Sequence, residues 1–409
     1  MARASHPSVD PALDAAALLR RIGFLGLFVI VPVTAQMGRR AAVILAPIAV
    51  VLLVLASAID GKSGPWRPAA LRLLRRPAWL AGLLLILWAI LSLVWTPFPD
   101  LATERLLNLI ATILLTIAGY LSLPERMRSA NLYLLPVGTA AAALVAILLG
   151  LFEHRFAGPS GDVDGTLDRG LTLLALLVWP AVAWLRSRGR DLESLGLALL
   201  VAAALVVSPN APQLAALAVG AAAFALTTLR PSLGITVASL GAALLLVAAP
   251  LLPFLARPVA SALFGPVSPG ALSLKVWQKI VTTEPLRLVT GHGFETALRG
   301  RIVNLLPANA PTTLLFELWY ELGIVGAFAA AFALHAAIRR GGRETPVLVP
   351  GAMAAFAAAF TIACIGVGLT VMWWLTTLTV AILSFVAVAR GQFRTRRPKA
   401  SQLPQHETP

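Results

Sequence analysis

The sequence predicts an all-α polytopic membrane protein with about 12 transmembrane helices. Of its 409 residues, 58% are hydrophobic and only 12% are charged, and the mean hydropathy is +0.85. A soluble globular chain is closer to half apolar. The charged residues gather in short tracts, and the stretches between them are long and apolar enough to cross a bilayer. Lipid must therefore solvate most of the apolar surface.

The apolar stretches define nine spans, then a large loop, then three more spans, with a polar tail at each end. Proline and glycine within several stretches are compatible with spans, because membrane helices tolerate both residues. The expected spans are 22–37, 41–59, 78–96, 106–123, 130–151, 168–185, 192–208, 213–229, 233–256, 312–337, 346–366 and 369–389. The resulting regions are an N-terminal tail at 1–21, spans one to nine within 22–256, the large loop 257–311, spans ten to twelve within 312–389 and a basic tail at 390–409.

The charge distribution sets the expected orientation. A formal net charge of +15 would suggest nucleic acid for a soluble protein, but in a membrane protein positive residues mark cytoplasmic loops, so we expect no nucleic-acid partner. With a cytoplasmic N-terminus, about 22 of the 33 basic residues fall inside, and the C-terminus is cytoplasmic too. The run 22–35 could mimic a signal peptide, but this pattern requires it to be an uncleaved first helix. Arg39 and Arg40, which follow it, go against the rule.

The large loop 257–311 lies outside in this orientation and is not a polar linker. It contains Phe264, Trp277 and Phe294, and its apolar residues around 272–281 have helical spacing. We expect a small helical cap whose amphipathic helices lie on the membrane surface.

Charged residues on the outer side are few, so each is a candidate for function. The first candidate is Arg169, beside Asp168 at the entry of the sixth span, although an arginine that snorkels to the lipid headgroups is an equal alternative. The second is a cluster in the large loop, whose basic groups suit an anionic ligand such as a lipid diphosphate. Its members are Lys275, Lys279, Arg287, His292, Glu295, Arg299 and Arg301.

Two local patterns within these regions add to the candidates. The turn Gly291-His292-Gly293-Phe294 is expected to leave backbone N–H groups free and to expose His292, although a lone histidine is more often structural. Glu317 and Glu321 are four residues apart on one face of the tenth span, so they either face a cavity, pair with arginine, or pack in a polar network between helices. We find no metal-binding pattern and no nucleotide-binding loop, and the single cysteine, Cys364, can form no internal disulfide, so no cofactor is expected.

Four pieces of the chain carry a family resemblance. They are LDRGLTLLALLVWPA at 167–181, SPNAPQLAALAVG at 208–220, VWQKIVTTEPLRLVTGHGFETALRG at 276–300 and LLFELWYELGIVG at 314–326. With the large loop between them, their order resembles the O-antigen ligase and polymerase family of bacterial envelope glycosyltransferases over roughly residues 90–389.

The resemblance implies a metal-independent, inverting transfer of glycan from an undecaprenyl-diphosphate carrier at the periplasmic face of the inner membrane. A ligase passes the glycan to lipid A–core, and a polymerase passes it to another carrier-linked repeat. Arginines hold the diphosphate in this family, and Arg169 matches one such position. A histidine just before the tenth span is expected to be the base that activates the acceptor hydroxyl.

The chain departs from this pattern at two places. Ala310-Pro311-Thr312-Thr313 stands where the family has its histidine, and Ser273 stands where an arginine usually precedes the loop tryptophan. If the protein is active, His292, Glu295 or Glu317 must act as the base. The alternatives are a relative that binds carrier-linked glycan without transferring it, and a transporter with 12 helices, although the chain shows no two-half symmetry.

Overall fold

A computed structural model of the protein describes residues 11–61, 76–156, 163–208, 210–344, 346–368 and 370–392. Every regular element in these ranges is a helix, which confirms the all-α prediction. Parts of the predicted tails (1–10 and 393–409) and the basic tract 62–75 lie outside the described residues.

The helices follow one another along the chain in two groups, before and after the bend that ends α12. The first group is α1 (Pro11–Leu25), η1 (Gly26–Ile30), α2 (Val31–Ala35), α3 (Ala41–Asp60), α5 (Pro77–Ser92), α6 (Pro99–Ser122), α7 (Ser129–Leu132), α8 (Leu134–Phe156), α9 (Val163–Ser187), α10 (Asp191–Val207), α11 (Ala211–Leu229) and α12 (Pro231–Val247). The second group is η2 (Ala249–Leu251), α13 (Leu252–Phe264), α14 (Pro269–Thr283), α15 (Arg287–Thr290), α16 (Thr296–Ile302), α17 (Leu314–Glu344), η3 (Pro346–Leu348), α18 (Val349–Ile365) and α19 (Met372–Arg390).

The helices fit a polytopic membrane protein. Within the described residues, 9 helices are long and apolar enough to cross a membrane, and the bent pair α12–α13 would be a tenth. Two further expected spans fall on shorter helices, α5 with 16 residues and α10 with 17. The outer faces of the helices expose many large apolar side chains, among them Leu80, Leu83 and Leu87 on α5. A soluble monomer would not expose such a surface, whereas lipid covers it.

The helix of the first expected span begins earlier than predicted, at Pro11, so the tail expected at 1–21 is helical from that residue. Helix α9 lies at the centre of the bundle, where 89% of its span is buried, and its Trp184 packs edge-on against Tyr133 of the α7–α8 connection. Because α9 is held in this way, it fixes the position of Arg169 near its N-terminal end.

The ninth expected span, 233–256, is not a single straight helix. Its first helix, α12, ends at Val247, and the chain turns by 64° into α13, so the expected span corresponds to a bent helix pair, and the start of the large loop at 257 stays a prediction. Pro250 explains the bend, because proline has no N–H to donate to the carbonyl four residues earlier. That carbonyl, of Leu246, accepts a hydrogen bond from the indole of Trp319 at 2.6 Å instead.

Helix α17 also breaks, at Gly323, where φ is +63° and ψ is −157°. Only glycine adopts this backbone region readily. The break frees carbonyl groups in the preceding turn, and other segments donate to them. The Trp88 indole donates to Leu322 at 2.8 Å, and the loop before α16 donates to Tyr320 and Glu321. The kink therefore anchors that loop to the bundle.

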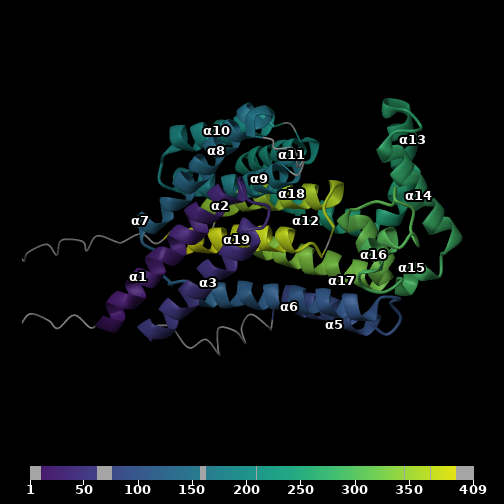
Figure 1. Ribbon diagram of the computed structural model, residues 1–409, viewed down its shortest axis with the longest axis horizontal. Helices are drawn as coiled ribbons and strands as arrows, with labels where there is room; N and C mark the ends of the chain where they lie inside the picture. The colour runs from purple at the N-terminus through teal and green to yellow at the C-terminus, as the bar shows by residue number, and fades with distance from the viewer. Residues whose placement is uncertain are drawn as a thin grey trace, which may run out of the picture.

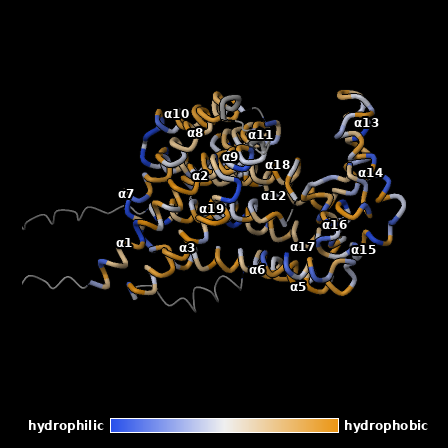
Figure 2. Tube along the Cα trace, viewed as in Figure 1, coloured by the Kyte–Doolittle hydropathy of each residue, from blue (hydrophilic) through white to orange (hydrophobic). Residues whose placement is uncertain are grey.

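The bundle has two distinct ends (Figure 1). The α13–α16 segment lies at one end, which we call the α16 end, and the start of α1, the helix α7 and the end of α19 lie at the other. Figure 2 shows apolar residues along the bundle helices and hydrophilic residues concentrated towards these two ends. The predicted helix around 272–281 is α14, and its Trp277 is buried against Phe316 of α17 with ring centroids 5.7 Å apart.

Candidate functional site

A basic cavity lies where the first residues of several helices meet. Its volume is about 740 Å³, within the range of ligand sites. We call it the arginine pocket. Its lining is Arg39, Arg40, Val43, Ile44, Arg105, Arg169, Val371, Met372 and Trp373. The four guanidinium groups come from the α2–α3 turn, α6 and α9, so tertiary structure brings them together.

Two further features of the arginine pocket favour an anion. Arg40 immediately precedes α3 and Val371 immediately precedes α19, so two helix N-termini, whose dipoles favour an anion, open at the pocket. The Arg169 guanidinium donates to the backbone carbonyl of Arg39 at 3.2 Å and lies 5.4 Å from the ring centroid of Trp373. These contacts fix the direction of a side chain that is only half-buried.

The neighbourhood of Arg169 joins two of the sequence pieces that carry the family resemblance. Asp168 accepts a hydrogen bond at 2.5 Å from the side-chain amide of Asn210, which lies in the α10–α11 connection. The Gln213 amide donates to the Asp168 carbonyl at 3.2 Å and to the Thr172 hydroxyl at 3.0 Å. This polar network holds the start of α9 against the start of α11.

A second, smaller cavity adjoins the first and contains a carboxylate. Its volume is about 220 Å³, and we call it the glutamate pocket. Its lining is Leu298, Arg301, Thr312, Glu317, Gly366, Val367, Gly368, Thr370, Val371 and Trp373. Val371 and Trp373 line both pockets, so the two cavities meet at the start of α19.

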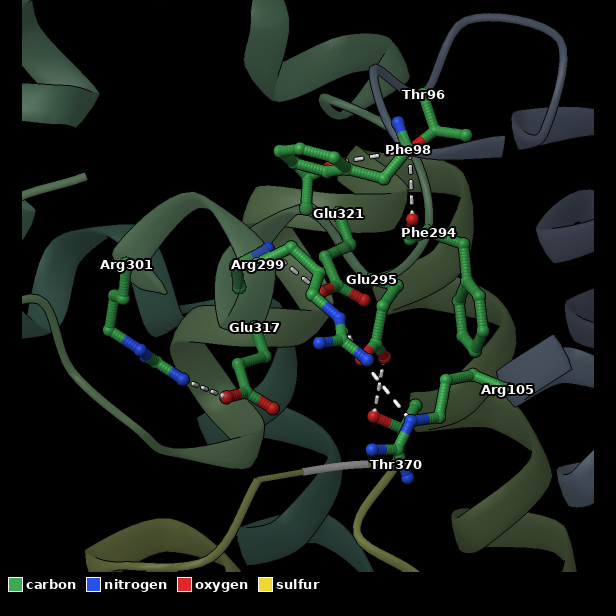
Figure 3. A network of polar contacts seen from close by, with 12 residues as sticks. Thr96, Phe98, Arg105, Phe294, Glu295, Arg299, Arg301, Glu317, Glu321 and Thr370 are labelled. Carbon is green, nitrogen blue, oxygen red and sulfur yellow. Dashed lines mark hydrogen bonds and ion pairs between the residues drawn. The ribbon is translucent and has the colours of Figure 1, made fainter. Parts of the chain in front are cut away.

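Arg301 holds the Glu317 carboxylate in place (Figure 3). One guanidinium nitrogen of Arg301 lies 3.2 Å from Glu317 Oε1, and the other donates to the Pro311 carbonyl at 2.7 Å. Glu317 is almost fully buried, which an ionised carboxylate tolerates only with such a partner. Of the roles considered from sequence, Glu317 therefore both faces a cavity and pairs with an arginine.

Glu295 contacts one residue of each pocket (Figure 3). It is fully buried, and its Oε1 lies 3.5 Å from Arg105 Nε and 3.7 Å from Arg299 Nε. Its Oε2 accepts a hydrogen bond from the Thr370 hydroxyl at 2.9 Å. Arg105 lines the arginine pocket and Thr370 lines the glutamate pocket. Glu295 thus positions one residue of each cavity.

The backbone and the ionisation of Glu295 both show that this position is strained. Its φ is +65°, in the left-handed region that non-glycine residues enter at a cost of about 1–3 kcal/mol. Burial raises the pKa of the Glu295 carboxyl above its usual value, while the Thr370 hydroxyl and the guanidinium groups of Arg105 and Arg299 oppose that rise. Such strain is common where a side chain is held for function.

The structure places His292 differently from the prediction. The two glycines of its turn do take positive φ, +74° at Gly291 and +100° at Gly293. The turn's N–H groups are not free, however, because those of His292 and Gly293 donate to the carbonyls of Tyr320 and Glu321 at 2.8 and 3.0 Å. The prediction of free N–H groups is therefore wrong.

The His292 ring stacks on Tyr320 with centroids 4.0 Å apart. Its Nδ1 lies 3.0 Å from the Tyr320 carbonyl oxygen and its Nε2 lies 2.7 Å from the Glu284 carboxylate. Each ring nitrogen therefore faces an oxygen of the protein rather than either pocket. This arrangement suits a residue that fixes the loop.

The remaining basic candidates divide by position. Arg299 and Arg301 belong to the cluster around Glu295 and Glu317, whereas Lys275, Lys279 and Arg287 are exposed on α14 and α15 and line neither pocket. Lys275 and Lys279 are four residues apart and so share one face of α14, but the sequence does not indicate where that face points.

Sequence reasoning missed several residues of the site: Arg39, Arg40, Arg105, Thr370 and Trp373. One signal for two of them was present. Arg39 and Arg40 were exceptions to the positive-inside rule, and such an exception is itself an indication of function.

Comparisons with other proteins do not assign this chain to a family. Neither protein-family models nor curated protein sequences give a match to this chain. Among the described residues, no group of three or more His, Cys, Asp or Glu side chains is placed to hold a metal ion.

Proposed function

We propose that this chain is a glycosyltransferase of the O-antigen ligase and polymerase type. It transfers glycan from an undecaprenyl-diphosphate carrier to lipid A–core or to a polysaccharide acceptor at the periplasmic face of the bacterial inner membrane. The observation that supports this most is the meeting of an arginine pocket and a glutamate pocket at Trp373. A diphosphate needs the first, and activation of a hydroxyl needs the second.

The proposed topology has 12 spans, cytoplasmic termini and a periplasmic cap formed by α13–α16. Helix α10, with 17 residues, has the minimum length for a span, and the turns that follow the 16 residues of α5 extend it towards the α16 end. In this orientation the arginine pocket faces the periplasm, where the positive-inside rule disfavours basic residues. Four arginines at such a position are best explained by an anionic ligand.

The arginine pocket is proposed to bind the diphosphate of the carrier. Guanidinium groups match phosphate oxygens geometrically and remain charged at every physiological pH. They also stabilise the negative charge that develops on the diphosphate as it leaves. Trp373, at the boundary between the pockets, offers an aromatic face beside the first sugar of the glycan.

The glutamate pocket is proposed to hold the acceptor hydroxyl, with Glu317 as the base. The hydroxyl proton passes to the Glu317 carboxylate while the acceptor oxygen forms a bond to the anomeric carbon. The bond from that carbon to the diphosphate breaks, and its electron pair leaves with the diphosphate, so the anomeric configuration inverts. Glu317 is preferred to Glu295, which is fully buried and lines neither pocket, and to His292, whose ring nitrogens both face acceptors.

One observation favours the alternative of binding without catalysis. Thr312 lies in the lining of the glutamate pocket, in the segment where the family has its histidine, and a threonine hydroxyl is no base near neutral pH. In that alternative the arginine pocket still binds the carrier diphosphate, but Glu317 serves only to pair with Arg301.

The test is the lipopolysaccharide gel profile of a strain that lacks the gene, together with its pool of carrier-linked glycan. Loss of the polymer ladder with long glycan on the carrier identifies a ligase, and loss with single repeats on the carrier identifies a polymerase. Complementation with the wild-type gene and with the Glu317→Gln variant separates catalysis from binding. An unchanged ladder with a normal carrier pool would refute a role in lipopolysaccharide synthesis.

A further inference from the structure

A second cavity lined by four arginines lies at the opposite end of the bundle. Its volume is about 390 Å³, and we call it the distal pocket. Its lining is Arg76, Pro77, Ala78, Ala336, Arg339, Arg340 and Arg343. Every charged residue in this described lining is an arginine. The glycan-transfer proposal gives this cavity no role.

The helix directions show which end of the bundle this is. Helix α5 leaves the distal pocket and ends near Thr96, whose hydroxyl donates to the Phe294 carbonyl beside α16 at 3.0 Å. Helix α17 starts at the α16 end, and three of the four arginines of the distal pocket, Arg339, Arg340 and Arg343, belong to its last turns. The distal pocket therefore lies at the end remote from the arginine pocket, which is the cytoplasmic end in the proposed orientation.

An apolar groove adjoins the distal pocket. It has a volume of about 460 Å³ and lies between α5, α6 and α19. We call it the lateral groove. Its lining is Arg76, Trp79, Leu109, Thr112, Ile113, Thr116, Ile117, Tyr120, Leu375, Leu378, Thr379, Ile382 and Val386. Arg76 lines both cavities, so the positively charged distal pocket and the apolar lateral groove meet at the start of α5.

The threonine hydroxyls of the groove do not interrupt its apolar character. The Thr116 and Thr379 hydroxyls hydrogen-bond to one another at 2.8 Å, and Thr112 and Thr116 also donate to carbonyls of their own helix. Hydroxyls satisfied within the protein offer little to a polar ligand and permit contact with hydrocarbon.

We propose that the distal pocket and the lateral groove together bind an anionic phospholipid, with its phosphate at the arginines and an acyl chain in the groove. Guanidinium groups pair with phosphate, and basic pockets between membrane helices bind such headgroups. Four arginines favour a lipid with two phosphates, such as cardiolipin, over one with a single phosphate. The proposal does not depend on glycan transfer, and its test measures lipid binding alone.

The experiment uses the full-length protein purified in a non-ionic detergent. Cardiolipin, phosphatidylglycerol, phosphatidylcholine, undecaprenyl phosphate and inorganic phosphate are titrated separately, and bound ligand is counted by native mass spectrometry. We expect cardiolipin to bind most tightly, then phosphatidylglycerol, with phosphatidylcholine and inorganic phosphate at least tenfold weaker. Tighter binding of inorganic phosphate would overturn the assignment to a phospholipid. So would undecaprenyl phosphate binding that exceeds cardiolipin binding and is lost in the distal-pocket variant Arg76→Gln/Arg339→Gln/Arg343→Gln.

Charge removal at the pocket is compared with charge removal elsewhere at the same end. The variant Arg76→Gln/Arg339→Gln/Arg343→Gln should bind cardiolipin about 100-fold more weakly, since each basic residue near an anionic lipid contributes about fivefold. The matched control Arg21→Gln/Arg128→Gln/Arg230→Gln loses three exposed arginines that do not line the pocket, and it should bind within twofold of wild type. Equal weakening in both variants would show nonspecific attraction and refute the site.

A variant that keeps all four arginines tests the groove. Ile113→Trp fills the lateral groove, and it should weaken binding of long-chain phosphatidylglycerol about tenfold while leaving a short-chain, dihexanoyl form unchanged. Equal binding of the long-chain lipid by wild type and Ile113→Trp would refute the placement of the acyl chain. This arm remains decisive if the triple arginine variant does not fold.

Discussion

Replacing Glu317 by glutamine is the most direct test of the proposed chemistry. Glutamine has the same shape as glutamate, and its side-chain carbonyl can still accept a hydrogen bond from Arg301, 3.2 Å away. The substitution therefore removes the charge and the basicity while it keeps the packing. If Glu317 takes the acceptor proton, kcat should fall by about 10²–10⁴, since general base catalysis contributes that much. At 1.36 kcal/mol per factor of ten, this corresponds to about 3–5 kcal/mol.

A purely structural role for Glu317 predicts a different result. Its ion pair with Arg301 is nearly buried, with the side chains 5% and 10% exposed, so glutamine leaves Arg301 with a hydrogen bond but no counter-charge. That lowers the temperature of unfolding, but it changes the turnover of the folded enzyme only severalfold. The pH dependence separates the two roles. The decline of kcat/KM at low pH, which reports protonation of an essential base, should disappear in Glu317→Gln only if Glu317 is that base.

The matched control is Glu321→Gln. Glu321 lies one turn further along α17 and is as buried as Glu317, but its Oε1 accepts from the Ala297 N–H at 3.0 Å and it does not line the glutamate pocket. The assay is transfer of glycan from purified carrier-linked donor to acceptor in detergent, with unfolding temperature measured for each variant. Retention of more than about a tenth of wild-type kcat in Glu317→Gln, or an equal loss in Glu321→Gln, would refute the assignment.

Three further outcomes test other parts of the structure. Gly323→Ala should lower the free energy of unfolding by about 3 kcal/mol or more, because the φ of +63° is unfavourable for alanine and the new Cβ would lie 2.5 Å from an α15 carbonyl oxygen. Thermal unfolding in detergent measures this. The control is Gly341→Ala, whose Cβ meets open space and which should therefore be tolerated. The raised pKa of Glu295 means that the folded state binds the proton of this carboxyl more tightly than the unfolded state does, so the stability that the protonated carboxyl contributes is lost as the pH rises through the usual glutamate range and above. Glu295→Gln should therefore flatten the dependence of the unfolding temperature on pH. An unchanged dependence would contradict burial of the Glu295 carboxyl as its cause. Arg169→Gln should raise KM for the carrier-linked donor about 10-fold or more and reduce its salt dependence, whereas Lys275→Gln, an exposed side chain on α14, should leave KM within twofold.

The helices could be predicted from sequence because a membrane span is a local property. Length and hydropathy locate each one, and all the expected spans fall on helices of the structure. The bend after Val247 could not be predicted in the same way, since Pro250 lies in a stretch that is still apolar and many membrane helices contain proline. What shows the bend is the partner of the freed Leu246 carbonyl, the indole of Trp319, which is distant in sequence.

The candidate site was only partly predictable for the same physical reason. Arg169 and Glu317 could be identified because a charge at the end of a span is costly wherever the chain folds. The role of the turn at His292 could not, because it depends on the break at Gly323, which frees the carbonyls that the turn uses. Arg105 looked like an ordinary residue near the end of a helix, and only the fold shows that it lies between Glu295 and the arginine pocket.

An arginine of this protein indicates function only where its position in the membrane topology is energetically unfavourable. In the proposed orientation the end opposite α16 is cytoplasmic, and arginines there, such as Arg20 in its ion pair with Asp60 at 3.0 Å, satisfy the positive-inside rule at almost any surface position. Their number therefore says little about function. In the proposed orientation the α16 end is periplasmic, so the same rule disfavours each added arginine there. Arg39, Arg40 and Arg105 nevertheless converge there on one cavity with Arg169, from three separate parts of the chain. Mutual repulsion among guanidinium groups adds to the cost, so an anionic ligand in that cavity is the simplest compensation. The distal pocket lies at the end where the positive-inside rule favours arginine in the proposed orientation, so its position alone does not indicate a ligand. Its assignment depends instead on the adjoining apolar groove and on a control that removes equal charge.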